Sequence, residues 1–148
     1  MTEHKVIGRS VDKYDGLDKV TGKARYASDL NQDSLYGVAL RSPVHHARIT
    51  RLDASRALGM PGVIGVVTAA DVPGKPLYGR LIQDRPVLAS DVVLHIGEPV
   101  ALVVARSAGQ AEKAAAAIQL EFELLPAVHD VTQSILETAP RLHPDGNV

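Results

Sequence analysis

The chain has 148 residues, 45% of them hydrophobic, and a formal net charge of −1, which suits one globular domain and excludes the broad basic surface of a nucleic-acid-binding protein. It has no cysteine, so disulfides, iron–sulfur ligation and thiolate zinc sites are excluded. No apolar run approaches the roughly 20 residues of a membrane helix, and the polar N-terminus lacks a signal-peptide core, so the sequence predicts a cytoplasmic protein.

Residues 1–34 are polar, and the segment Asp15–Tyr26 sets two glycines among charged residues with few apolar positions. This composition predicts an extended segment that is held by contacts rather than by a core of its own. The pair Gly22 and Lys23 resembles part of a phosphate-binding loop. The preceding glycine, however, stands one residue too far away, and alanine replaces the required Ser or Thr, so we reject a nucleotide site here.

Two short runs of alternating apolar residues follow, Tyr36–Leu40 and Ala47–Leu52, with Pro43 between them. Alternation over so few residues predicts half-buried strands, and proline ends the first run because it has no N–H to donate to a ladder. We expect the two runs to pair with each other and the remaining elements to pack onto this pair. Arg41 and Arg48 would then lie on its polar rim.

The rest of the chain is expected to alternate between strands, helices and turns. Val100–Ala105 is the most apolar run and predicts a central strand, and Ser107 is a suitable N-cap for the main helix, which should end near Leu120. Gly74–Asp91 is long enough to be a functional or interface loop. The other expected elements are short helices at 53–59 and 132–138 and strands at 63–68, 92–96 and 121–125. This order predicts an α+β fold with a mixed sheet, one main helix and short helices.

The histidines and arginines of the strand region could bind a metal ion or an anion, but ordinary polar contacts explain them more simply. The adjacent pair His45–His46 is a poor chelate because neighbouring side chains of a strand point to opposite faces, so we favour a polar role over a metal site. The planar guanidinium groups of Arg41 and Arg48 could bind an anion. We favour ion pairs with Asp29, Asp53 or a carboxylate of a partner, because exposed ion pairs are common.

Glu98 lies in a Gly-Glu-Pro turn between two expected strands, where a lone carboxylate can act as a general base. We instead expect an interface or loop residue there. Neither Ser42 nor Ser107 has a recognisable base and orienting acid, and the sequence contains no nucleophile-elbow motif. Nucleophilic catalysis therefore has no positive support.

Six blocks of sequence lie between about Gly16 and His143: D-K-V-T-G-K-A-R-Y, L-R-S-P, H-A-R-I, P-G-V-I-G-V-V-T-A-A-D-V-P-G, G-E-P-V-A-L-V-V-A and E-F-E-L-L-P-A-V. In order and spacing, they resemble the α/β hammerhead domain of the molybdenum hydroxylases, the xanthine dehydrogenase and aldehyde oxidase family. The resemblance implies a hammerhead domain over 16–143, an N-terminal extension at 1–15, and a tail at 144–148 that leads to a molybdopterin-binding domain absent from this sequence.

The resemblance further implies a structural, subunit-packing domain of an oxidoreductase that is not catalytic alone. It implies no catalytic, cofactor-binding or metal-binding residue in this chain. The full complex would hold molybdopterin, iron–sulfur clusters and FAD, carried by a molybdopterin-binding chain or domain and by iron–sulfur and flavin subunits. The residues expected at the interface with these partners are Lys19, Gly22, Arg41, His46, Arg48 and Glu98.

Two other functions compete with this interpretation. One is a stand-alone module that binds a small ligand through the segment Gly74–Asp91, and the other is a small hydrolase, for which the sequence offers no site. Exposed apolar surface separates the candidates, because a subunit needs a large apolar patch and an independent binding module does not.

Overall fold

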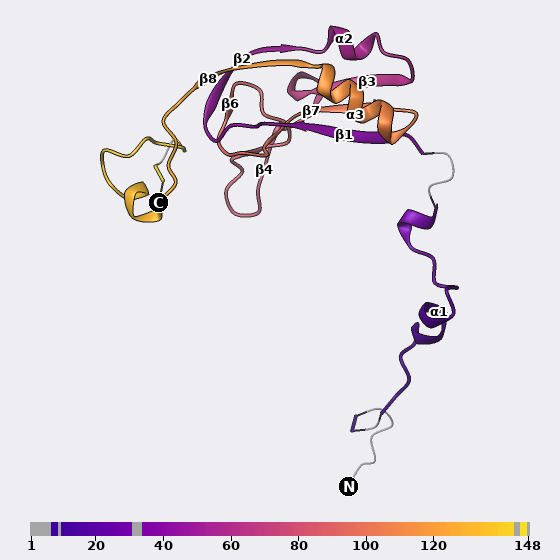
Figure 1. Ribbon diagram of the computed structural model, residues 1–148. Coiled ribbons are helices and arrows are strands. Elements are labelled where there is room, and N and C mark those ends of the chain that lie inside the picture. Colours follow the sequence, from indigo (N-terminus) through magenta and orange to yellow (C-terminus); the bar gives the residue numbers. More distant parts are fainter. Residues whose placement is uncertain (1–6, 9, 31–33, 144–145, 148) are drawn as a thin grey trace. The chain divides into compact units, whose positions relative to one another are not determined.

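The computed structural model describes residues 7–8, 10–30, 34–143 and 146–147. Residues 1–6 and 9 of the predicted N-terminal extension, residues 31–33, and residues 144–145 and 148 of the predicted tail lie outside the described residues. The contacts divide the chain into two units, Met1–Ser34 and Leu35–Val148, and each is described by itself (Figure 1). The domain ranges 1–15, 16–143 and 144–148 stay predictions.

The second unit contains two three-stranded antiparallel sheets and a two-stranded hairpin. The first sheet has the order β1-β7-β3, with β1 at Tyr36–Arg41, β7 at Pro99–Ala105 and β3 at Val63–Thr68. The second has the order β6-β2-β8, with β6 at Val92–Val93, β2 at Ala47–Asp53 and β8 at Gln119–Leu124. The hairpin joins β4 (Leu77–Tyr78) to β5 (Arg85–Pro86), and the 3-10 turn η2 (Ala69–Asp71) follows β3. These sheets with few, short helices confirm the predicted α+β class.

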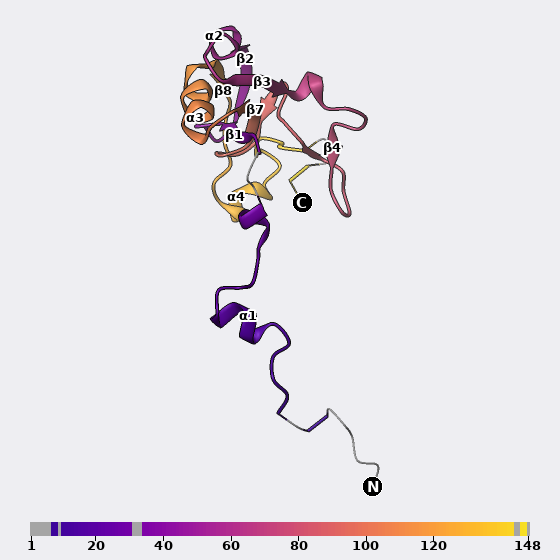
Figure 2. The ribbon, with the colours of Figure 1, turned by 90° about the vertical axis from the view of Figure 1, so that its right-hand side faces the viewer.

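Strand β7 is central, as predicted, and contributes to both parts of the core. Val103 is fully buried and lies opposite Val38 of β1 and Val66 of β3. It belongs to the cluster beneath helix α3 (Ala108–Ala117), whereas Val100 belongs to a cluster with residues of the second sheet. Figure 2 shows α3 on one side of the unit and the β4–β5 hairpin extending from the other.

Helix α3 begins where the sequence predicts and ends earlier. The Ser107 hydroxyl oxygen accepts a hydrogen bond from the Gln110 N–H (3.4 Å), which caps the first turn. The buried face consists of Ala111, Ala114 and Ala115. Ile118 already has an extended backbone, and β8 begins one residue later, so the predicted end near Leu120 is wrong because the chain turns directly into a strand.

The expected pairing between the first two strands is wrong. β1 pairs with β7, while β2 pairs with β6 and β8 in the other sheet. Alternation indicates a half-buried strand but does not choose its neighbour, and the chain between Arg41 and Ala47 crosses from one sheet to the other. Arg41 and Arg48 therefore lie on different sheets and do not share one rim.

The prediction of a continuous loop over Gly74–Asp91 is wrong in part. This segment contains the β4–β5 hairpin and returns to the core at Leu88 and Ala89, which are buried. The Ala89 N–H donates to the carbonyl oxygen of Pro99 (2.9 Å), which fastens the end of the segment to β7. The strand expected at 92–96 shortens to β6, because the chain turns immediately afterwards.

Aspartates begin both short helices of the second unit. At α2 (Ser55–Leu58), Asp53 accepts a hydrogen bond from the first helical N–H (3.0 Å), and Gly59 ends the helix as expected. At α4 (Val131–Ser134), which is shorter than predicted, Asp130 stands at the N-cap and accepts from two backbone N–H groups. No helix among the described residues is long and apolar enough to cross a membrane.

The first unit contains α1 (Gly16–Val20) and the 3-10 turn η1 (Ala27–Leu30). The prediction of an extended segment is wrong over α1, where Lys19 pairs with Asp15 one turn earlier. Neither α1 nor η1 has a buried residue, so neither is stabilised by a core within this unit. Its exposed large apolar residues are Ile7, Val11, Tyr14, Leu17, Val20, Tyr26 and Leu30.

Candidate functional site

Two buried polar residues, Ser42 and Glu98, mark the place where the chain crosses between the two sheets. They are 2% and 4% exposed, and among the described residues they are the only polar ones that are buried. The connections from β1 to β2 and from β6 to β7 both pass here. We call Arg41–Val44 and Leu94–Pro99 the crossover junction.

Backbone hydrogen bonds hold the two halves of the crossover junction together. The Ser42 N–H donates to the Glu98 carbonyl oxygen and the Gly97 N–H donates to the Ser42 carbonyl oxygen, each at 2.8 Å. The Ser42 hydroxyl donates to the Val44 carbonyl oxygen (2.8 Å) and accepts from the Val44 N–H (3.1 Å). Gly97 has a φ of +85°, which favours glycine. These hydrogen bonds join the two connections directly, backbone to backbone.

The carboxylate of Glu98 closes the turn in which it lies. Its Oε2 accepts a hydrogen bond from the Leu94 N–H (2.6 Å), and its own N–H donates to the His95 carbonyl oxygen (3.3 Å). The side chain therefore supports the turn between β6 and β7 from the inside. Its expected contact with a partner stays a prediction.

Arg41 and Arg48 have different partners. The Arg41 Nη1 donates to the Gly97 carbonyl oxygen (2.8 Å), so this guanidinium braces the crossover junction and does not form the favoured ion pair. The Nε of Arg48 lies 3.3 Å from Oε2 of Glu123 on the neighbouring strand β8, so this arginine forms an ion pair, but not with the expected Asp29 or Asp53. Both pairs are exposed, so each contributes little to stability by itself.

The adjacent histidines fasten the segment after β8 to the start of β2. His46 Nδ1 lies 2.6 Å from the Pro126 carbonyl oxygen, and the His46 carbonyl oxygen accepts from the Leu125 N–H (2.9 Å). The His45 ring meets the His129 ring edge to face, with centroids 4.7 Å apart. These contacts are of the polar kind that we favoured over a metal site.

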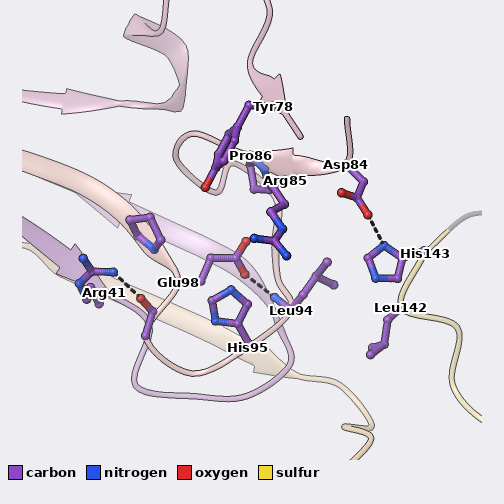
Figure 3. A pocket seen from close by; sticks show the side chains of 12 residues that line it. Arg41, Tyr78, Asp84, Arg85, Pro86, Leu94, His95, Glu98, Leu142 and His143 are labelled. Carbon is purple, nitrogen blue, oxygen red and sulfur yellow. Dashed lines mark hydrogen bonds and ion pairs between the residues drawn. The ribbon is translucent and has the colours of Figure 1, made fainter. Parts of the chain in front are cut away.

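A hollow of about 720 Å³, which we call the polar hollow, opens beside the crossover junction (Figure 3). Arg41 and Glu98 both line it, and at its far wall Asp84 Oδ2 lies 3.2 Å from His143 Nδ1. Its lining consists of Arg41, Tyr78, Asp84, Arg85, Pro86, Leu94, His95, Gly97, Glu98, Pro99, Leu142 and His143. Both signs of charge are present on its wall.

A second hollow of about 850 Å³, the apolar hollow, lies between the β4–β5 hairpin, the β6 region and the C-terminal segment. Leu77, Ile82 and Leu125 give it an apolar lining, and His46 also borders it. Asp84 and His143 line both hollows, so their contact lies between the two spaces.

The structure thus brings together only part of the predicted interface. Arg41 and Glu98 share the polar hollow, His46 borders the apolar hollow, and Arg48 lines neither. Lys19 and Gly22 belong to the first unit, where Lys19 is held by Asp15 and Gly22 follows α1 with a φ of +71°. That any of these residues contacts a partner stays a prediction.

Sequence reasoning missed several residues of the polar hollow. Asp84 lies in the segment that we expected to be a loop, and His143 lies in the C-terminal segment that we expected to be irregular, about 60 residues further along. No periodicity relates the two positions. The only available signal was that a long segment between strands is often functional.

Three aspartates at the starts of helical segments have lowered pKa values. The pKa of Asp53 is lowered from 3.8 to about 2, chiefly by hydrogen bonding from the Ser55 side chain, then by the Ser55 N–H and by Arg51. The pKa of Asp71 is lowered by the Thr68 N–H and hydroxyl, and that of Asp130 by hydrogen bonds from the segment that it caps. These carboxylates stabilise local structure.

The described residues do not fit a metal ion held by this chain alone. Nowhere in the described ranges do three His, Cys, Asp or Glu side chains converge on one point. The contact between Asp84 and His143 and that between His45 and His129 each offer two groups at most. No chemical step through a metal or molybdopterin is therefore assigned to this chain. The prediction that it binds neither can be tested by elemental analysis.

The comparisons with known proteins agree with this geometry. Residues 21–126 match the family model described as aldehyde oxidase and xanthine dehydrogenase, a/b hammerhead domain. The chain is 36% identical over 147 residues to the nicotinate dehydrogenase large molybdopterin subunit of Eubacterium barkeri, covering 99% of this chain and 35% of the relative. It is 41% identical over 139 residues to the nicotine 6-hydroxylase large subunit of Paenarthrobacter nicotinovorans, covering 88% of this chain and 17% of that relative.

Among solved structures, aldehyde oxidoreductase from Desulfovibrio gigas superposes with a TM-score of 0.82 at 35% identity. The match covers 88% of this chain and 16% of that one. The chain therefore spans about a third or less of the length of these relatives. The hammerhead-like fold inferred from the six sequence blocks is confirmed.

Proposed function

The chain belongs to the aldehyde oxidase and xanthine dehydrogenase family through its a/b hammerhead domain, and on this premise we propose that it is a structural domain that packs against the molybdopterin-binding part of a molybdenum hydroxylase. In this role it would carry out no chemistry alone. Iron–sulfur and flavin subunits would complete the enzyme. The cytoplasmic location stays a prediction.

The observation that supports this proposal most strongly is the exposed apolar tip of the β4–β5 hairpin. Leu81 is 95% exposed and Ile82 is 72% exposed, although both follow a strand that is anchored to the folded unit. Gly79 shapes this tip, because a Cβ there would lie 1.8 Å from the Ile82 carbonyl oxygen. Exposed large apolar side chains that are held together at one turn are typical of a contact surface.

The first unit adds a second apolar surface of the same kind. Seven large apolar side chains are exposed among its described residues, and neither of its two short helical segments has a buried residue. Ordering each backbone residue costs about 1–2 kcal/mol, which this unit does not recover from a core of its own. A partner that covers these side chains would supply the missing stabilisation.

The chain's own residues would then have positioning roles. The crossover junction holds the connections of both sheets in one conformation, so that the Arg41 and Glu98 side chains keep fixed positions. Glu98 and Ser42 stabilise this junction from within, and Arg41 braces it from the edge. A preformed surface lowers the ordering cost of association.

The alternative function is a stand-alone module that binds a small ligand. The polar hollow favours it, because about 720 Å³ lies within the usual size of ligand sites, roughly 300–1,000 Å³. Such a module would bind without any other chain. It would leave the apolar hairpin tip unexplained.

Hydrogen exchange tests the proposal. The isolated chain and its mixture with the molybdopterin-binding chain of the same organism would be compared, with an unrelated protein of similar size and charge as the control. We expect fast exchange at 15–26 and 76–87 in the isolated chain and protection of both segments in the mixture. Strong protection in the isolated chain, unchanged on mixing, would favour the stand-alone module.

A further inference from the structure

The Glu98 residue is buried, but its Oε1 reaches solvent and has neither a hydrogen-bond partner nor a counter-charge among the described residues. The residue is 4% exposed, and its side chain has one hydrogen-bond partner, the Leu94 N–H. No Lys, Arg or His nitrogen of the described residues lies within 4.0 Å of its oxygens. A carboxylate has two oxygens with about four acceptor positions, so one N–H leaves most of them unused. Covering that oxygen without supplying a cation would be strongly unfavourable.

The cations nearest to this space are engaged elsewhere or exposed. Arg41 lines the polar hollow, but its Nη1 is bonded to the Gly97 carbonyl oxygen. Arg85 also lines it and remains exposed, with no ion pair to a described carboxylate (Figure 3). His143 is held by Asp84. The hollow of about 720 Å³ is thus lined by a carboxylate that no cation of the described residues pairs with.

We propose that the polar hollow receives a basic side chain of the molybdopterin-binding partner, whose ammonium or guanidinium group pairs with the Glu98 carboxylate. This inference rests on the proposed function and names the group that the same surface recognises. A guanidinium would donate to the unused carboxylate oxygen, and its alkyl stem would pack against Pro86 and Leu94 on the wall.

The surroundings of the hollow favour a protein side chain over a free cation. Tyr78 on its wall and Ile96 at the turn beside it are more than half exposed, and the apolar hairpin tip lies only three residues beyond Tyr78 in the chain. Apolar side chains around a buried polar contact are the arrangement of a protein interface, where they exclude water from the central charge pair. A free ion would not cover them.

The test is the substitution Glu98→Gln, measured in the isolated chain and in the complex. The amide oxygen can still accept from the Leu94 N–H, and the amide NH₂ then faces the hollow, where it repels a cationic donor. We expect an unchanged or higher melting temperature for the isolated chain, since the hydrogen bond from the Leu94 N–H is kept and an unpaired charge is removed. We expect Kd for the partner to rise at least about tenfold. Glu112→Gln, an exposed carboxylate on α3, is the matched control and should change neither.

The outcomes separate the two proposals. If the unchanged chain does not bind the partner, the proposed function fails. If the chain binds and Glu98→Gln leaves Kd unchanged, the inference fails and the proposed function stands.

Arg85→Gln tests whether the chain supplies its own cation. If Glu98→Gln and Arg85→Gln each lower the melting temperature of the isolated chain, and the double substitution lowers it no further, Arg85 is the counter-charge and the inference fails. Methylguanidinium, compared with sodium chloride at equal ionic strength, tests for a small free cation. If it raises the melting temperature of the unchanged chain but not that of Glu98→Gln, and the two proteins have the same Kd for the partner, the inference also fails.

Discussion

The strand β7 and the β4–β5 hairpin are both rich in apolar side chains and end in opposite environments. Val103 of β7 is fully buried beneath α3 and Val100 is fully buried against the second sheet, whereas Leu81 and Ile82 of the hairpin are 95% and 72% exposed. The difference does not come from composition. β7 has a strand on each side and a helix above it, while the hairpin pairs only with itself.

The comparison indicates which surfaces the chain completes alone and which it leaves open. Apolar residues that have local partners build the core of the second unit. Those at the hairpin tip have no such partners among the described residues, and in the proposed function they are buried against the molybdopterin-binding part. The predictions below test this distinction.

Placing a charge in the β7 core should have the largest effect. Val103→Asp buries an ion among alkyl groups beneath α3, which costs several kcal/mol, and no cation lies in that cluster to pair with it. We expect loss of the folded chain, seen as absence of a cooperative thermal transition by circular dichroism. A variant that melts within a degree of the unchanged chain would contradict the assignment of β7 to the core.

Removing the Ser42 hydroxyl should have an intermediate effect. Ser42→Ala leaves the Val44 N–H without its acceptor in a part-buried position, and the cost should be about 1–3 kcal/mol of unfolding free energy. Ser90→Ala, where the hydroxyl is exposed, should cost less than about 0.5 kcal/mol. Urea titrations measure both. Equal costs for the two variants would show that the crossover junction does not depend on this side chain.

Acid should weaken the second unit through its capping aspartates. The pKa of Asp53 is about 2 when folded and 3.8 ordinarily, so its contribution is fully present above pH 3.8 and is lost as pH falls towards 2. The lowered pKa values of Asp71 and Asp130 act in the same direction. We expect the melting temperature to fall between about pH 4 and pH 2. In Asp53→Asn that fall should be shallower, and an identical slope would rule out the contribution of Asp53.

A charge at the hairpin tip should have the smallest effect on stability. Leu81→Asp places the carboxylate in water, so the unfolding free energy should change by less than about 0.5 kcal/mol. Binding to the partner should nevertheless weaken, because the charge would be desolvated on contact. Leu81→Asp is thus expected to weaken binding and leave stability almost unchanged, whereas Val103→Asp is expected to abolish folding. A loss of stability at Leu81 comparable with that at Val103 would abolish the distinction between the two regions.

Local features of the fold could be predicted from the sequence because they depend on nearby residues. The apolar run of β7, the serine cap of α3 and its alanine face follow from spacing alone. Strand pairing could not be predicted, since an alternating run such as Tyr36–Leu40 fits beside any strand that offers an apolar face. The helix α1 was missed because two glycines among charges outweighed the Asp15–Lys19 pair.

The candidate site could be predicted from the sequence less well than the fold. Arg41, His46 and Glu98 could be singled out from their blocks, but nothing in a Gly-Glu-Pro turn indicates that the carboxylate folds inward to the Leu94 N–H. The contact between Asp84 and His143 depends on the path of the whole chain between them. Long-range proximity of this kind has no signature in a single sequence.

Sedimentation of the chain mixed with the molybdopterin-binding chain tests the central claim most directly. The account predicts a stoichiometric complex at micromolar concentrations for the unchanged chain and a weaker one for Leu81→Asp, although both variants remain folded. Two separately sedimenting species for the unchanged, folded chain at those concentrations would contradict the claim that this domain exists to pack against that partner.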